Sequence, residues 1–184
     1  LWAALCCSVT AAWAAESPRA PVPATVSPPM QRLISADPPP YCNRHPKSAG
    51  EWREFVNGFV EAVVPMLPAL RGQMGVGMET GHMAGVPVFI ISPESPNADK
   101  ADKVLLNFHG GGYVLGPGES GTPEAILMAG FGGYRVIMPD YRMLPDHPYP
   151  AAMDDATAVY KELLKTVPAE KIAVFGTATG GGMT

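Results

Sequence analysis

The segment that decides the fold is residues 104–113, Val-Leu-Leu-Asn-Phe-His-Gly-Gly-Gly-Tyr. Residues 103–108 form an apolar run of the kind found in strands that are covered on both faces. Three consecutive glycines follow directly after His109. Glycine lets the backbone approach a ligand closely and turn its N–H groups toward a negatively charged oxygen. A merely flexible turn is the simpler alternative, but the position directly after a buried strand favours a binding loop.

A second glycine-rich loop follows another predicted strand. Residues 171–175 are predicted to form that strand, and residues 176–182 read Gly-Thr-Ala-Thr-Gly-Gly-Gly. A strand, a Gly-x-x-x-Gly turn and a helix make up a nucleophile elbow, which lifts its central residue to the top of the sheet. That central residue should be serine, and here it is Ala178. The backbone N–H of the following residue, Thr179, would join the donors of the first loop.

Strands and helices alternate through this part of the chain. Residues 86–91 and 134–138 are two further predicted strands. One helix is predicted to begin at Thr122, which is followed by a proline at the first helical position, and another is predicted over residues 149–167. This alternation is typical of an α/β fold, a mostly parallel sheet with helices on both faces. Ligands in such folds bind at the carboxyl ends of the strands, where both glycine loops are expected.

An amphipathic helix is predicted before the first strand. Ser48 and Glu51 have the spacing of a capping box, and Pro65 is expected to end the helix. Its apolar stripe has helical spacing and consists of Trp52, Phe55, Val56, Phe59, Val60, Val63 and Val64. This stripe packs against the body of the domain or covers a substrate as a lid, and the sequence leaves both interpretations open.

The N-terminal region is interpreted as a leader and a spacer. Residues 1–15 are short, apolar and rich in small residues, which favours the remnant of a secretory signal over an ordinary apolar helix. This signal predicts a secreted or periplasmic protein. Residues 16–47 form a proline-rich spacer, and residues 48–184 form the domain, with its first helical part at residues 48–70. Without residues 1–15 only Cys42 remains, so the sequence predicts no disulfide within the chain.

Composition excludes several classes of partner. Thirteen Lys and Arg stand against 17 Asp and Glu, a net charge of −4, whereas a nucleic-acid-binding surface would be basic. No apolar run reaches the roughly 18 residues of a membrane helix. The four histidines have no metal-ligand spacing, so no metal and no cofactor are predicted. The sequence does not predict an oligomeric state.

Three motifs together resemble the bacterial hormone-sensitive-lipase family of α/β-hydrolase esterases. They are residues 109–112, residues 140–155 (Asp-Tyr-Arg-Met-Leu-Pro-Asp-His-Pro-Tyr-Pro-Ala-Ala-Met-Asp-Asp) and residues 172–182, in the order that the family has them. The resemblance extends from about residue 81 to residue 184. It implies the N-terminal part of an α/β-hydrolase fold with an N-terminal helical cap, truncated after the nucleophile elbow.

The resemblance also implies roles for individual residues. Gly111, Gly112 and Thr179 would donate N–H groups to the oxyanion of an acyl-ester substrate. Tyr113 would contact that substrate. A structural role in bracing the loops falls to Asp140, Arg142 and His147.

Two departures from the family pattern separate the function hypotheses. Ala178 has no oxygen to attack a carbonyl, and the family's acid and histidine would follow Thr184. The first hypothesis is therefore a carboxylesterase of which this chain is an inactive fragment. The second is a non-catalytic ligand-binding protein on a hydrolase body. A dinucleotide-binding domain is a remote third, because Gly176, Gly180 and Gly182 also match the glycine spacing of short-chain dehydrogenases.

Overall fold

A computed structural model describes residues 21–37 and 44–184. The chain divides into two compact units, residues 1–43 and 44–184. In the first unit the described residues contain one helix, α1 (Pro28–Ser35). It begins with two prolines, a residue type that is favoured in the first turn of a helix because no N–H group is needed there. The predicted signal remnant and Cys42 lie outside the described residues. The second unit contains the sheet and both glycine-rich loops.

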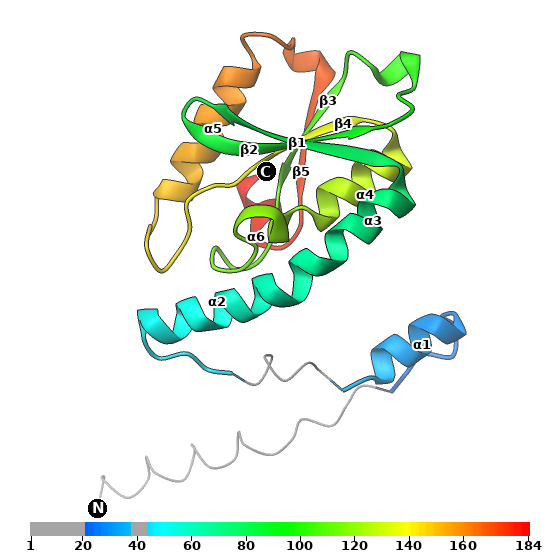
Figure 1. Cartoon of the computed structure of the whole chain (residues 1–184), viewed down its shortest axis with the longest axis vertical. Helices are drawn as coiled ribbons and strands as arrows, with labels where there is room; N and C mark the ends of the chain where they lie inside the picture. The colour runs from blue at the N-terminus through cyan, green and yellow to red at the C-terminus, as the bar shows by residue number, and fades with distance from the viewer. Residues whose placement is uncertain (1–20, 38–43) are drawn as a thin grey trace, which may run out of the picture. The chain divides into compact units, whose positions relative to one another are not determined.

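Five strands of the second unit form one sheet in the order β1-β2-β4-β3-β5 (Figure 1). The strands are β1 (Val76–Met83), β2 (Val86–Pro93), β3 (Val104–Phe108), β4 (Arg135–Pro139) and β5 (Ile172–Gly176). β4, β3 and β5 are parallel neighbours, as the alternating sequence pattern predicts. β2 runs antiparallel to both β1 and β4. The sheet is therefore mixed, and its parallel half carries the candidate site.

β1 has no counterpart among the strands that the sequence predicts. Ala84 and Gly85 join it to β2 in a two-residue turn, with φ angles of 51° and 82°. Positive φ at both positions is the geometry of a tight hairpin, whose twist matches that of the flanking strands. The antiparallel edge of the sheet follows directly from this turn.

Helices cover both faces of the sheet (Figure 1). Those of the second unit are α2 (Ala49–Val63), α3 (Leu67–Met74), α4 (Pro123–Gly132), α5 (Ala151–Leu163) and α6 (Thr179–Met183), with short 3-10 turns η3 (Val64–Met66), η4 (Ala98–Lys100), η5 (Gly118–Gly121) and η6 (Ala169–Lys171). α3 and α4 share one core with the sheet residues Phe89, Ile91 and Val136. α5 and the end of α6 share the other core with Leu106, Phe108 and Ile137. The expected α/β layering is confirmed.

The predicted N-terminal helix is α2. Ser48 is its N-cap, and the Ser48 side chain accepts a hydrogen bond from the Glu51 backbone at 3.2 Å. Pro65 ends the α-helical pattern, but the chain continues through η3 into α3 rather than into a loop. The apolar stripe of α2 is half-buried, and none of its residues is fully buried. Arg53, at the edge of this stripe, forms an ion pair with Asp146.

Among the described residues, no helix combines the length and the apolar character that a bilayer crossing requires.

Candidate active site

The two glycine-rich loops lie side by side because their strands are parallel neighbours. β3 and β5 pair in register, so that Phe108, the last residue of β3, lies opposite Gly176, the last residue of β5. The carboxyl ends of both strands therefore lie at the same end of the sheet. The Gly110–Gly112 loop and the turn around Ala178 therefore face each other, as the sequence predicts.

Ala178 has the strained backbone of a nucleophile elbow. Its φ is 50° and its ψ is −120°, a conformation that side-chain-bearing residues rarely adopt. The two flanking glycines permit this sharp turn, since a Cβ at Gly176 or at Gly180 would overlap the Phe108 carbonyl oxygen. The exposed Ala178 side chain thus projects where the elbow would present a nucleophile.

The first glycine loop packs tightly against this elbow. A Cβ at Gly110 would lie 2.9 Å from the Thr177 carbonyl oxygen and 3.3 Å from the Ala178 Cβ. Gly111 and Gly112 have φ angles of 122° and 68°, which explains why glycine is needed there. The Gly111 carbonyl accepts the Leu115 N–H at 2.9 Å, which closes the loop on itself.

One contact between the loops has no signal in the sequence. The Gly112 N–H donates a hydrogen bond to the Thr179 side-chain oxygen, Oγ1, at an N–O distance of 3.2 Å. Gly112 and Thr179 are both predicted oxyanion donors, and the structure brings them together. The hydroxyl of one donor residue thus accepts the N–H of the other.

His109 is buried beneath the loop and has a structural environment. Its ring stacks on Tyr141 with 4.4 Å between ring centroids, and its Nδ1 lies 2.7 Å from the Gly110 carbonyl oxygen. The Tyr141 hydroxyl donates to the His109 carbonyl at 2.6 Å. Burial lowers the pKa of His109, and its Nε2 has no hydrogen-bond partner among the described residues. His109 is therefore a buried neutral ring that supports the loop.

The segment after β4 braces the loops through two of the three residues predicted for this role. Asp140 accepts the Gly118 N–H at 2.9 Å. The Arg142 guanidinium donates to both carboxylate oxygens of buried Asp155, with a shortest distance of 2.7 Å. Burial alone would raise the pKa of Asp155, but the hydrogen bonds from Arg142 outweigh this effect and lower it. These contacts fix the segment against η5 and α5.

Tyr113 joins the glycine loop to this segment. Its carbonyl accepts the Leu144 N–H at 2.9 Å, and its own φ is 60°. Its side chain lines a cavity of about 380 Å³ together with His147 and Met153. His147, the third predicted bracing residue, is exposed at the rim of this cavity. The cavity is therefore next to the glycine loop, where the sequence predicts contact with a substrate.

Glu124 is a polar residue of the site that no sequence motif marks. It lies in the first turn of α4 and accepts hydrogen bonds from buried Asn107 and from Thr177, each at 3.3 Å. Asn107 belongs to β3 and Thr177 to the elbow. Glu124 therefore links the ends of both site-bearing strands to α4.

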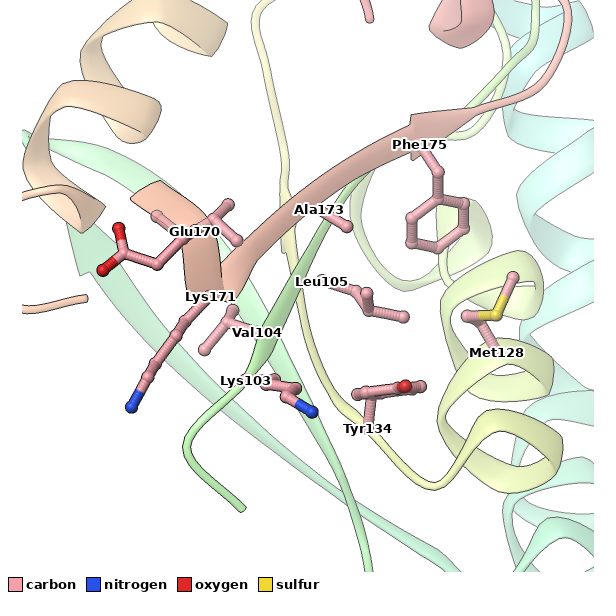
Figure 2. A pocket seen from close by; sticks show the side chains of 10 residues that line it. Lys103, Val104, Leu105, Met128, Tyr134, Glu170, Lys171, Ala173 and Phe175 are labelled. Carbon is pink, nitrogen blue, oxygen red and sulfur yellow. The ribbon is translucent and has the colours of Figure 1, made fainter. Parts of the chain in front are cut away.

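A second pocket, of about 330 Å³, lies between β3, β5 and α4 (Figure 2). The side chains of Leu105, Met128 and Tyr134 turn into the same space there. Lys103 and Lys171, which directly precede β3 and β5, also line this pocket. It therefore lies near the amino ends of these strands, at the end of the sheet opposite the glycine loops. It contains none of the predicted site residues.

No group of three or more potential metal ligands occurs among the described histidines, cysteines and acidic residues.

Several solved esterase structures are similar to this chain. A family model described as the alpha/beta hydrolase fold matches residues 105–184. One solved esterase structure superposes on 91% of this chain and 53% of its own, with a TM-score of 0.82 and 38% identity. An esterase of the bacterial hormone-sensitive lipase family superposes on 78% of this chain and 45% of its own, with a TM-score of 0.58 and 27% identity. The chain therefore has the α/β-hydrolase fold, and it is similar to esterases of the bacterial hormone-sensitive lipase family.

Curated proteins that are similar to this chain include ester hydrolases. The ethyl acetate hydrolase of Pseudomonas putida is 32% identical over 121 residues, which cover 63% of this chain and 37% of the relative. The chain thus spans less than half the length of the curated relatives it matches.

Proposed function

We propose that the protein containing this chain belongs to a lineage of carboxylic ester hydrolases and that Ala178 occupies the position of the catalytic nucleophile. The observation that supports this proposal is the backbone of Ala178, with φ 50° and ψ −120°, opposite the glycine loop. An alanine gains nothing by itself from so strained a conformation. An elbow that presents a serine hydroxyl accounts for it.

The proposed reaction needs a serine at position 178. Its oxygen would attack the ester carbonyl carbon, and its proton would pass to a general base. The carbonyl oxygen would become an oxyanion that accepts N–H groups of Gly111, Gly112 and Thr179. Collapse of this intermediate would expel the alcohol, which takes up the proton, and water would then release the acid by the same steps. With Ala178 the first bond cannot form, so this chain is proposed to be inactive.

The proposed substrates are small esters of short acids. Ethyl acetate hydrolysis is the activity named for one relative. The cavity of about 380 Å³ beside Tyr113 has room for a small acyl or alcohol group. We therefore propose Tyr113 as a substrate contact.

The test is the substitution Ala178→Ser, made in the protein together with whatever sequence follows Thr184 in its gene. The kcat for hydrolysis of p-nitrophenyl acetate should rise by about 10⁴-fold or more, because removing a serine nucleophile lowers kcat by at least this factor. Ala173→Ser, which adds a hydroxyl on the exposed side of β5, is the matched control. If the two variants turn over equally slowly, the esterase proposal is wrong.

Ala178 itself supports a second proposal, a binding protein that holds an ester or carboxylate without turnover. The parent protein would then bind butyrate or ethyl butyrate in calorimetry, while Ala178→Ser would remain inert. Hydrolysis by Ala178→Ser combined with no binding by the parent would exclude this alternative.

A further inference from the structure

The Thr179 hydroxyl accepts a hydrogen bond from a backbone N–H group that the proposed reaction needs. The Gly112 N–H points at Thr179 Oγ1, 3.2 Å away, rather than being free for a substrate oxygen. Gly112 is exposed, and a Cβ there would meet no atom within 4 Å, so the loop is open to solvent at this point. The hydrogen bond is thus made inside the proposed oxyanion site and not in the packed part of the loop.

Both ends of this hydrogen bond are held by rigid neighbours. Gly180, directly after Thr179, fits against the Phe108 carbonyl with no room for a side chain. Gly111, directly before Gly112, fits in the same way against the Leu115 carbonyl. Threonine is branched at Cβ, which restricts the rotation of its side chain. The backbone on both sides of the contact is therefore confined by packing.

The strength of the competing acceptors decides what this contact does. A hydroxyl and an ester carbonyl are both neutral acceptors, so a bound substrate gains little by displacing the Thr179 oxygen. A developing oxyanion is charged, and hydrogen bonds to charged acceptors are roughly twice as strong. The N–H is then released to the transition state but not to the substrate.

We propose that the Thr179 side chain is a positioning residue that withholds the Gly112 N–H from the substrate and releases it only to the oxyanion; we name this contact the Thr179 latch. The inference rests on the proposed ester hydrolysis and deepens it. The latch adds to the barrier between bound substrate and transition state. Its removal should therefore change kcat and leave KM unchanged.

The kinetic test compares Thr179→Val with its parent in the Ala178→Ser background. Valine keeps the branched shape and the backbone N–H but removes the acceptor. The expected result is a kcat about two- to ten-fold higher at unchanged KM, because a neutral intramolecular hydrogen bond is modest when water is the alternative partner. Thr157→Val, on the exposed face of α5, is the matched control and should leave kcat unchanged. A lower kcat in Thr179→Val would overturn the latch, since the hydroxyl would then itself assist the oxyanion.

A second readout is independent of activity. With ¹⁵N-glycine labelling, the Gly112 amide proton should exchange with water several-fold faster in Thr179→Val than in the parent, whereas Thr179→Ser should keep the slow rate. Equal exchange in all three proteins would overturn the latch whatever the kinetics show. Faster exchange in Thr179→Val, combined with an inert Ala178→Ser protein, would support the hydrogen bond and overturn the esterase proposal.

Discussion

Ala178 adopts a backbone conformation that costs a residue with a Cβ about 1–3 kcal/mol. Glycine adopts positive φ freely but loses up to about 1 kcal/mol through its greater freedom in the unfolded chain. Ala178→Gly should therefore raise the free energy of unfolding by about 1 kcal/mol net, measured by urea denaturation.

The matched control for this prediction is Ala173→Gly on β5. Ala173 is not among the described residues with positive φ, so glycine there only weakens a strand and should lower the free energy of unfolding by about 0.5–1 kcal/mol. Equal effects of the two substitutions would mean that the elbow stores no strain.

The packing of α6 on β3 depends on the absence of one side chain. A Cβ at Gly180 would overlap the Phe108 carbonyl at the end of β3, so α6 fits against β3 only with glycine there. Gly180→Ala should lower the free energy of unfolding by about 2–3 kcal/mol, the upper part of the range for overpacked sites. Thermal or urea denaturation measures this loss.

Gly182 in the same helix provides the comparison. A Cβ at Gly182 would meet nothing within 4 Å, so Gly182→Ala should cause no loss of stability. If Gly180→Ala were tolerated equally well, α6 would not be anchored on β3.

The sequence predicts β2, β3, β4 and β5 but does not predict β1. β3, β4 and β5 contain continuous apolar runs, which are a strong signal for buried strands. β1 contains Gly77, Glu79 and Gly81, and most of it is exposed or half-buried, so neither alternation nor β-propensity marks it as a strand. Its pairing comes from the turn and from β2, not from its own residues.

The candidate site is predictable in its backbone but not in its side-chain contacts. Glycine spacing indicates where N–H groups turn outward, because that depends on local conformation. The hydrogen bond between Gly112 and Thr179 joins loops from two different strands. Glu124 reaches Thr177 from a helix elsewhere in the chain. Such contacts depend on the packed fold, which residue spacing alone does not specify.

At the scale of the whole molecule, one ion pair connects α5 to the segment after β4. Asp155 is 6% exposed and accepts hydrogen bonds from both the Arg142 backbone and its side chain. The pKa of Asp155 is lower in the folded protein than in the unfolded chain, where it is about 3.9. The ion pair therefore stabilises the fold at pH values above about 3.9. That contribution disappears as the pH falls through the folded-state pKa.

Asp155→Asn should therefore lower the Tm by a few degrees at pH 7, and its difference from the parent should shrink as the pH falls below about 4. Differential scanning calorimetry over this pH range measures the effect. Asp154→Asn, an exposed neighbour on α5, is the control and should follow the parent throughout. A constant difference between Asp155→Asn and the parent would show that hydrogen bonding alone, without charge, explains the pair.

The two-residue turn at Ala84 and Gly85 also affects the order in which the strands pair during folding. β1 and β2 meet across this turn, and a hairpin of this kind closes within microseconds. β3 and β5 are separated by α4, β4 and α5, so their pairing must wait for a long loop to close. As the chain emerges from the ribosome, we expect the antiparallel edge of the sheet to assemble first. The two loops of the candidate site then come together last, when β5 joins β3.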